Sequence, residues 1–147
     1  MKTLSEKLIK MKACKEAILF CENKTLEQAW NKCKRGDWML WLAFKMKRKR
    51  GWSNIKQITL AKVRCARLVQ HLMKDQRSLD ALDVAEKYAL GKATRKELND
   101  AATYAAYVAA DTIDAADVVT YAENIKLKIL KQCADICHET LRTGELN

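Results

Sequence analysis

Proline is absent from this chain of 147 residues and glycine occurs only four times, which restricts the possible folds more than any other feature. β-Sandwiches and barrels need a turn-forming residue every ~8–12 residues, so four glycines cannot supply their turns. We therefore expect an all-α protein with almost no strands. The length suits one compact domain spanning residues 1–147.

Hydrophobic periodicity and capping residues predict about seven helices. Thr3, Thr25 and Thr94 each precede a Glu or Gln by three residues, the pattern of a capping box, and Asp37 is expected to cap another helix. Because the connections are short, successive helices should pack as antiparallel neighbours in one bundle. The predicted helices cover about residues 3–22, 25–33, 38–44, 54–74, 78–90, 94–110 and 112–142.

The predicted helix at residues 38–44 is apolar on nearly all sides, so it must be deeply buried or partly covered by another molecule. Trp38 and Trp41 lie three residues apart on one face of it. We expect at least one of these two side chains to be fully buried. On that basis Trp41→Ala should lower the free energy of unfolding by ~3–5 kcal/mol.

Positive charge is concentrated in the first half of the chain. Residues 1–75 carry 19 Lys and Arg against 6 Asp and Glu, whereas residues 76–147 carry 9 against 12. The first half thus has a net charge of +13 and the second half −3. Such a basic half accelerates association with acidic partners, whether nucleic acid or an acidic protein, and does not distinguish between them.

A basic segment, residues 45–50, holds five cations just before Gly51 and Trp52 and is predicted to be a loop or a frayed helix end. Cations that neutralise phosphates beside a tryptophan that stacks on a base are typical of single-strand binders. The segment could equally be a solvated loop or contact an acidic protein. The residues that we expect to bind a partner are Lys45, Lys47, Arg48, Lys49, Arg50, Trp52, Arg35 and Asp37.

No pattern of catalytic or metal-binding residues stands out. The only histidines, His71 and His138, belong to no nucleophile–base arrangement. Cys133 and Cys137 beside His138 resemble part of a metal site, but His138 points ~100° away on a helix and no CxxC pair exists. The six cysteines are expected to be reduced, mostly core residues. We expect no catalytic residue, metal or cofactor.

The sequence contains no apolar run near the ~20 residues that a membrane span requires, and its first residues lack the apolar core of a signal peptide. These observations predict a cytoplasmic protein with no membrane partner.

The most distinctive segment is C-K-R-G-D-W-M-L-W-L at residues 33–42, preceded by Ala29 and Trp30. This run resembles the signature of the bacterial immunity protein family. The likeness covers about residues 26–138 and includes residues 61–67, 81–86, 91–94 and 133–136, while the basic residues 1–24 and 47–50 lie outside the family pattern.

The resemblance implies an all-helical, cytoplasmic inhibitor from bacteria or their phages. Such a protein neutralises a toxin or a host-defence effector by direct binding, without catalysis, and an acidic protein would suit the basic half of this chain. The alternative function is nucleic-acid binding through that same basic half.

Overall fold

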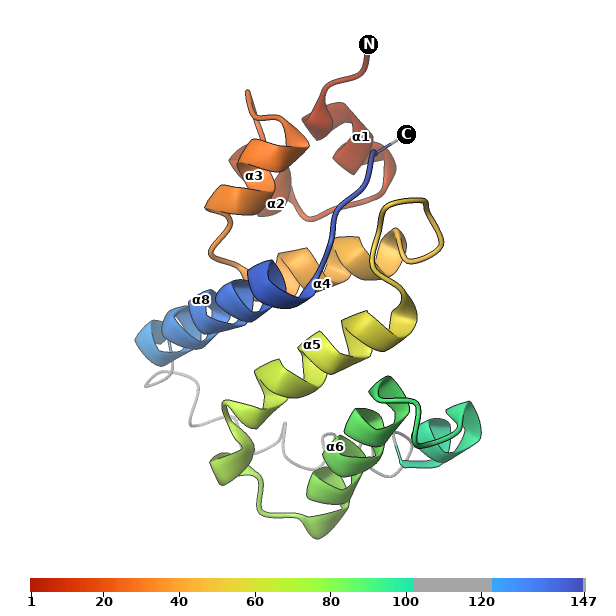
Figure 1. Ribbon diagram of the computed structural model, residues 1–147. Coiled ribbons are helices and arrows are strands. Elements are labelled where there is room, and N and C mark those ends of the chain that lie inside the picture. Colours follow the sequence, from red (N-terminus) through yellow and green to blue (C-terminus); the bar gives the residue numbers. More distant parts are fainter. Residues whose placement is uncertain (102–122, 147) are drawn as a thin grey trace.

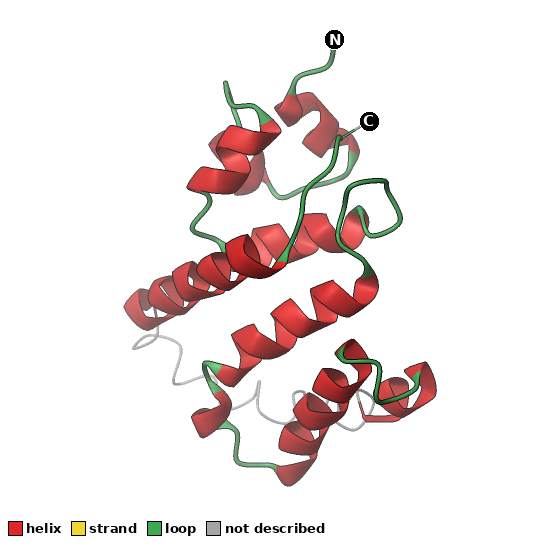
Figure 2. Cartoon of the chain, in the orientation of Figure 1, coloured by secondary structure: helices red, strands yellow, loops and turns green. Residues whose placement is uncertain are grey.

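The computed structural model describes residues 1–101 and 123–146, and every regular element in these ranges is helical (Figures 1 and 2). The all-α class is therefore confirmed. Residues 95–101 are also helical, and the rest of the predicted helix to residue 110 and the predicted helix over residues 112–122 lie outside the described residues. The other elements are α1 (Leu4–Lys10), α2 (Lys15–Phe20), α3 (Leu26–Lys32), α4 (Gly36–Lys45), α5 (Ile55–Arg67), the 3₁₀ helix η1 (Gln70–Leu72), α6 (Gln76–Ala89) and α8 (Glu123–Thr140).

Helices α4, α5 and α8 form the centre of the bundle. Helix α4 packs against α5 and α8, and α5 also packs against α6 and α8. The short helices α1, α2 and α3 gather on the opposite side of α4 from α5 (Figure 1). Burial of apolar side chains between these layers stabilises the fold by roughly 1.5–3 kcal/mol per large side chain. The most deeply buried apolar side chains are Met39, Ala43, Ile58, Ala61, Ala134 and Cys137.

The predicted single helix over residues 3–22 is wrong, because the chain turns between α1 and α2. Lys12 adopts a left-handed conformation with φ 62°. The Ala13 N–H donates to the Leu8 carbonyl at 3.0 Å and the Lys12 N–H to the Ile9 carbonyl at 3.0 Å, which is the Schellman pattern that ends helices. Glycine usually occupies the left-handed position, so a lysine there hides the break from sequence patterns.

Two further predicted boundaries differ from the structure. Helix α4 begins at Gly36 with Arg35 at the N-cap, so Asp37 lies in the first turn and does not cap the helix. The predicted helix over residues 54–74 ends at Arg67 and is followed by η1. Its broad apolar surface concealed this end, because Leu68 and Val69 continue the apolar pattern beyond Arg67.

The three predicted capping boxes are confirmed. Thr3, Thr25 and Thr94 each accept a hydrogen bond from the N–H three residues later, at 3.1–3.2 Å. Asn54 forms a fourth capping box with Gln57 that we did not predict. Among the described residues, no helix combines the length and the apolarity that crossing a bilayer requires.

All six cysteines are free thiols, and four of them are buried. The Cys65 thiol donates to the Cys133 carbonyl at 3.9 Å and the Cys137 thiol to the Gly36 carbonyl at 4.0 Å. Burial, together with the neighbouring Cys65, raises the pKa of the Cys133 thiol to about 12. The Cys133 thiol therefore stays protonated, and the three sulfur atoms serve as small apolar groups between α4, α5 and α8.

Thiol titration should separate the cysteines by burial. In native protein at pH 8 the exposed Cys14 should react first, because reagents reach a buried thiol only when the protein opens. Denatured protein should show all six free thiols, and a reducing agent should leave the melting temperature unchanged. A Cys14→Ser variant should lack the fast phase alone, whereas two or more missing thiols in denatured protein would contradict the assignment.

Candidate functional site

Three aromatic side chains, Trp38, Trp41 and Phe44, follow one another along α4 at intervals of three residues. Phe44 is 41% exposed, and both tryptophans are only partly buried. The prediction that Trp38 or Trp41 is fully buried is therefore wrong. The reason is that α1, α2 and α3 cover this side of α4 incompletely and leave a cavity against the two indole rings.

Each of these rings is contacted by a cation. The Arg35 guanidinium lies 4.4 Å from the ring centre of Trp38, and the Lys45 ammonium lies 5.7 Å from that of Trp41. Cations bind the negative face of aromatic rings with ~0.5–2 kcal/mol, depending on solvent exposure. We call the set of Trp38, Trp41 and Phe44 with their cations, Arg35, Lys45, Lys47 and Lys62, the cation–aromatic row.

Two lysines from different elements meet at Phe44. The Lys47 ammonium is 3.7 Å from the ring centre and the Lys62 ammonium, from α5, is 4.8 Å from it. Burial and then the charge of Lys47 lower the pKa of Lys62. Neither lysine forms an ion pair with a carboxylate of residues 1–101 or 123–146. This end of the row therefore carries two close positive charges that no carboxylate of the described residues neutralises.

The predicted loop at the basic segment is confirmed, since α4 ends at Lys45 and the following residues form turns. Arg48, Lys49 and Arg50 are exposed. None of them pairs with an acidic side chain in the described part of the chain. The basic segment thus presents its charges to solvent next to the cation–aromatic row.

Trp52 does not belong to this surface, which corrects its assignment as a partner-binding residue. The side chain is only 5% exposed, and its indole N–H donates to the Glu145 carbonyl at 3.1 Å. Its ring meets Trp30 edge-on, with 6.3 Å between the ring centres. The C-terminal residues lie over Trp52 and exclude it from solvent, which no local pattern around position 52 reveals.

Arg35 and Asp37, also predicted to bind a partner, are joined to each other. The Arg35 Nε and Nη2 atoms donate to the two carboxylate oxygens of Asp37 at 2.9 and 2.7 Å, and Glu16 lies 3.8 Å from Arg35. Burial acts to raise the pKa of Asp37, but the hydrogen bonds and the charge of Arg35 outweigh it, so the pKa is lowered. The pair therefore holds Arg35 against Trp38 at the beginning of the row.

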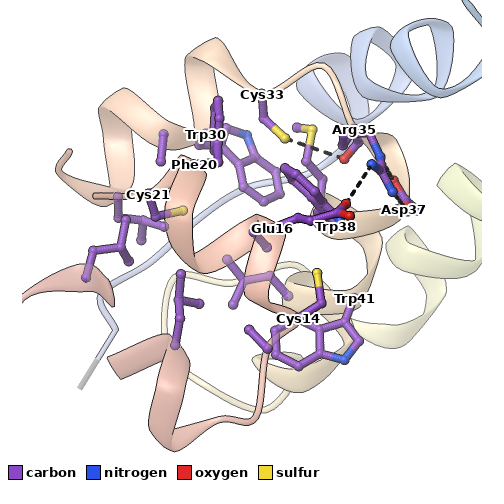
Figure 3. Close-up of a pocket in the computed structure, with 18 of the residues that line it drawn as sticks. Cys14, Glu16, Phe20, Cys21, Trp30, Cys33, Arg35, Asp37, Trp38 and Trp41 are labelled. Carbon is purple, nitrogen blue, oxygen red and sulfur yellow. Dashed lines mark hydrogen bonds and ion pairs between the residues drawn. The ribbon is translucent and has the colours of Figure 1, made fainter. Parts of the chain in front are cut away.

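A cavity of about 710 Å³ lies between α1, α2, α3 and the adjoining side of α4. Its volume falls in the range of ligand-binding pockets, and most of its lining is apolar or aromatic. Figure 3 shows Trp38, Trp41, Phe20 and Trp30 among its side chains, with Arg35 and Asp37 paired at one side. The cavity and the cation–aromatic row share both tryptophans of α4, so they form one continuous site.

Neither histidine lines the cavity or contacts a ring of the cation–aromatic row. The His138 Nε2 atom is 2.7 Å from the Trp30 carbonyl, which joins α8 to α3, and His71 is exposed. Within residues 1–101 and 123–146, no three His, Cys, Asp or Glu side chains are grouped as a metal ion would require.

Sequence reasoning missed Phe44 and Lys62 as members of the site. Phe44 could have been found, because it continues the three-residue interval of Trp38 and Trp41. Lys62 could not, because only the packing of α5 against α4 brings it to Phe44.

The chain was compared with protein families, curated proteins and solved structures. No family model, no curated protein and no solved structure matches it.

Proposed function

We propose that this chain is a non-catalytic inhibitor that neutralises another protein by binding an acidic surface of it. The observation that carries the proposal is the set of unpaired cations at one place. Lysines without an ion pair also occur elsewhere in the described residues, for example Lys2, Lys10 and Lys32. The basic segment differs in density, because it places five cations within six consecutive residues and Lys62 contacts the same ring as Lys47. None of these cations has an acidic partner among the described residues.

An acidic protein suits this surface better than a single-stranded nucleic acid. Single-strand binders stack bases on open aromatic faces, but Trp52 is buried. Phe44, the exposed ring, is already contacted by the ammonium groups of Lys47 and Lys62. Charge alone would still attract phosphates, so nucleic-acid binding is the alternative that the experiment must separate.

The identity of the target class comes from the resemblance of residues 33–42 to the immunity-protein signature. That likeness supports a toxin or a host-defence effector as the target. The inhibitor would act in the bacterial cytoplasm and be encoded by the bacterium or by one of its phages. Direct binding without chemistry is the mechanism by which such inhibitors act. The arrangement of cations here supplies electrostatic steering, which raises the association rate with an acidic target.

Replacing Lys47, Arg48, Lys49 and Arg50 together by serine should slow association with the target several-fold at low salt. The free energy of unfolding should change by only ~1 kcal/mol or less, because Arg48, Lys49 and Arg50 are exposed and Lys47 is only partly buried. The target would be captured from a native lysate, identified by mass spectrometry and purified. Surface plasmon resonance and chemical denaturation would then measure both effects.

A matched control removes four exposed lysines that lie elsewhere, by serine substitution of Lys2, Lys10, Lys32 and Lys34. It should retain most of the association rate. Equal losses in both variants would show that only the total charge matters. Two results together would favour the nucleic-acid alternative. The chain would be retained on single-stranded DNA with an affinity that falls steeply with salt, and no protein target would be captured at defined stoichiometry.

A further inference from the structure

We infer that the target docks through an acidic amphipathic segment, whose apolar side chain enters the cavity beside Trp38 and Trp41 and whose carboxylates reach Lys47 and Lys62. This inference rests on the proposed function and names the chemistry of the partner. The apolar cavity and the cations meet at Trp41, which lines the cavity and is contacted by Lys45.

The apolar half of the docking surface is the cavity. Trp38 and Trp41 line it and are partly exposed, and Phe20 meets Trp38 with 5.9 Å between the ring centres. A side chain of the size of leucine or phenylalanine that entered this space would remove apolar surface on both molecules from water. Tryptophans in such pockets are typical of the few residues that dominate binding energy at interfaces.

The charged half begins where the cavity ends. Lys45 contacts Trp41, and Lys47 and Lys62 contact Phe44, one further step along α4. A carboxylate placed between Lys47 and Lys62 would relieve the repulsion of their like charges. The lowered pKa of Lys62, caused by burial and then by Lys47, is consistent with a site that gains from an added negative charge. Phe44, which is 41% exposed, would supply apolar contact beneath it.

The spacing of the two halves suits one short segment. Trp41, which lines the cavity, and Phe44 are three residues apart on α4, which corresponds to ~4.5 Å along a helix axis and makes them neighbours on its surface. On a partner helix, residues four apart lie on the same face and ~6 Å from each other along the axis. A partner helix with an apolar residue and an acidic residue at this interval would therefore reach the cavity and Phe44 together.

The test uses two synthetic helical peptides of identical composition. In the first peptide each leucine is followed four residues later by a glutamate on the same face, and in the second the leucines lie on the opposite face. Fluorescence titration of the full chain should show at least tenfold tighter binding of the first peptide. Oligothymidine at the same ionic strength should bind more weakly than this peptide.

Two variants separate the apolar and the charged contributions. Ala17→Phe fills part of the cavity, which Ala17 lines, and Lys62→Gln removes one cation of the pair. Each should weaken binding of the first peptide about five- to tenfold, and Ala17→Phe should leave the second peptide unaffected. Lys56→Gln is the matched control, because Lys56 lies on the same helix over another ring, Tyr88, at 5.8 Å. It should bind the first peptide as the wild type does.

The outcomes distinguish this inference from the proposed function. Equal affinity for the two peptides, unchanged by Ala17→Phe and by Lys62→Gln, would overturn the docking inference and leave charge-driven protein binding intact. Binding of oligothymidine in preference to both peptides would overturn the proposed function as well. If Ala17→Phe fails to fold by circular dichroism, the surface variant Lys62→Gln and the comparison of the peptides still decide the matter.

Discussion

Replacing Gly36 with alanine is expected to lower the free energy of unfolding by about 3 kcal/mol or more. An added Cβ would lie 2.7 Å from the backbone nitrogen of Ala134 and would collide with the Cβ of Cys133. Both atoms belong to the body of α8, which cannot rotate away as a flexible side chain can. Helix propensity alone predicts the opposite sign, a gain of ~0.5–1 kcal/mol. Urea denaturation followed by circular dichroism would measure the difference.

Gly91→Ala provides the comparison. Gly91 has φ 78°, and an added Cβ would have no atom within 4 Å. This variant should lose only ~1–2 kcal/mol, from the left-handed backbone conformation that side chains disfavour. If Gly36→Ala loses no more stability than Gly91→Ala, helices α4 and α8 do not approach each other as closely as the structure shows.

Trp52→Ala is expected to cost ~3–5 kcal/mol of unfolding free energy, and Trp41→Ala only ~1–2 kcal/mol. The sequence alone assigned the larger loss to Trp41. The order reverses because Trp52 is 5% exposed and contacts Trp30, whereas Trp41 lines an open cavity and is partly exposed. Guanidinium denaturation of the two variants under identical conditions would rank them.

Trp52→Phe separates the hydrogen bond from the packing. It keeps an aromatic ring beside Trp30 but leaves the Glu145 carbonyl without its indole donor, so the loss should be ~1–3 kcal/mol. The loss of one downfield indole N–H resonance in this variant would assign the signal. A smaller loss for Trp52→Ala than for Trp41→Ala would contradict the burial of Trp52 beneath the C-terminal residues.

The candidate site was only partly predictable. The basic segment is visible as five cations within residues 45–50, and its conformation as a loop follows from that composition and the glycine after it. The prediction that Trp52 lies at the surface beside the basic segment was wrong. The ring beside the cations is Phe44, and Trp52 is buried. Nearness in sequence suggested Trp52, but the hydrogen bond to Glu145 forms across 93 positions.

Local features of the sequence determined the helical class and most helix boundaries. The capping boxes at Thr3, Thr25 and Thr94 form between residues three positions apart. At the end of α6, the Gly91 N–H donates to the nearby Tyr88 carbonyl. Because these contacts are local, the sequence near each helix end is sufficient to predict them. The absence of proline and the scarcity of glycine act in the same way, because they limit the backbone at each position.

Only the tertiary structure decided which side chains meet and which face solvent. Three features join segments that are distant in sequence or separated by a turn. These are the contact of Gly36 with α8, the approach of both Lys47 and Lys62 to Phe44, and the cavity beside Trp38. The exposure of a side chain depends on the segment that packs over it. Apolar periodicity shows that a helix has a buried face, but it does not identify the neighbour that covers that face.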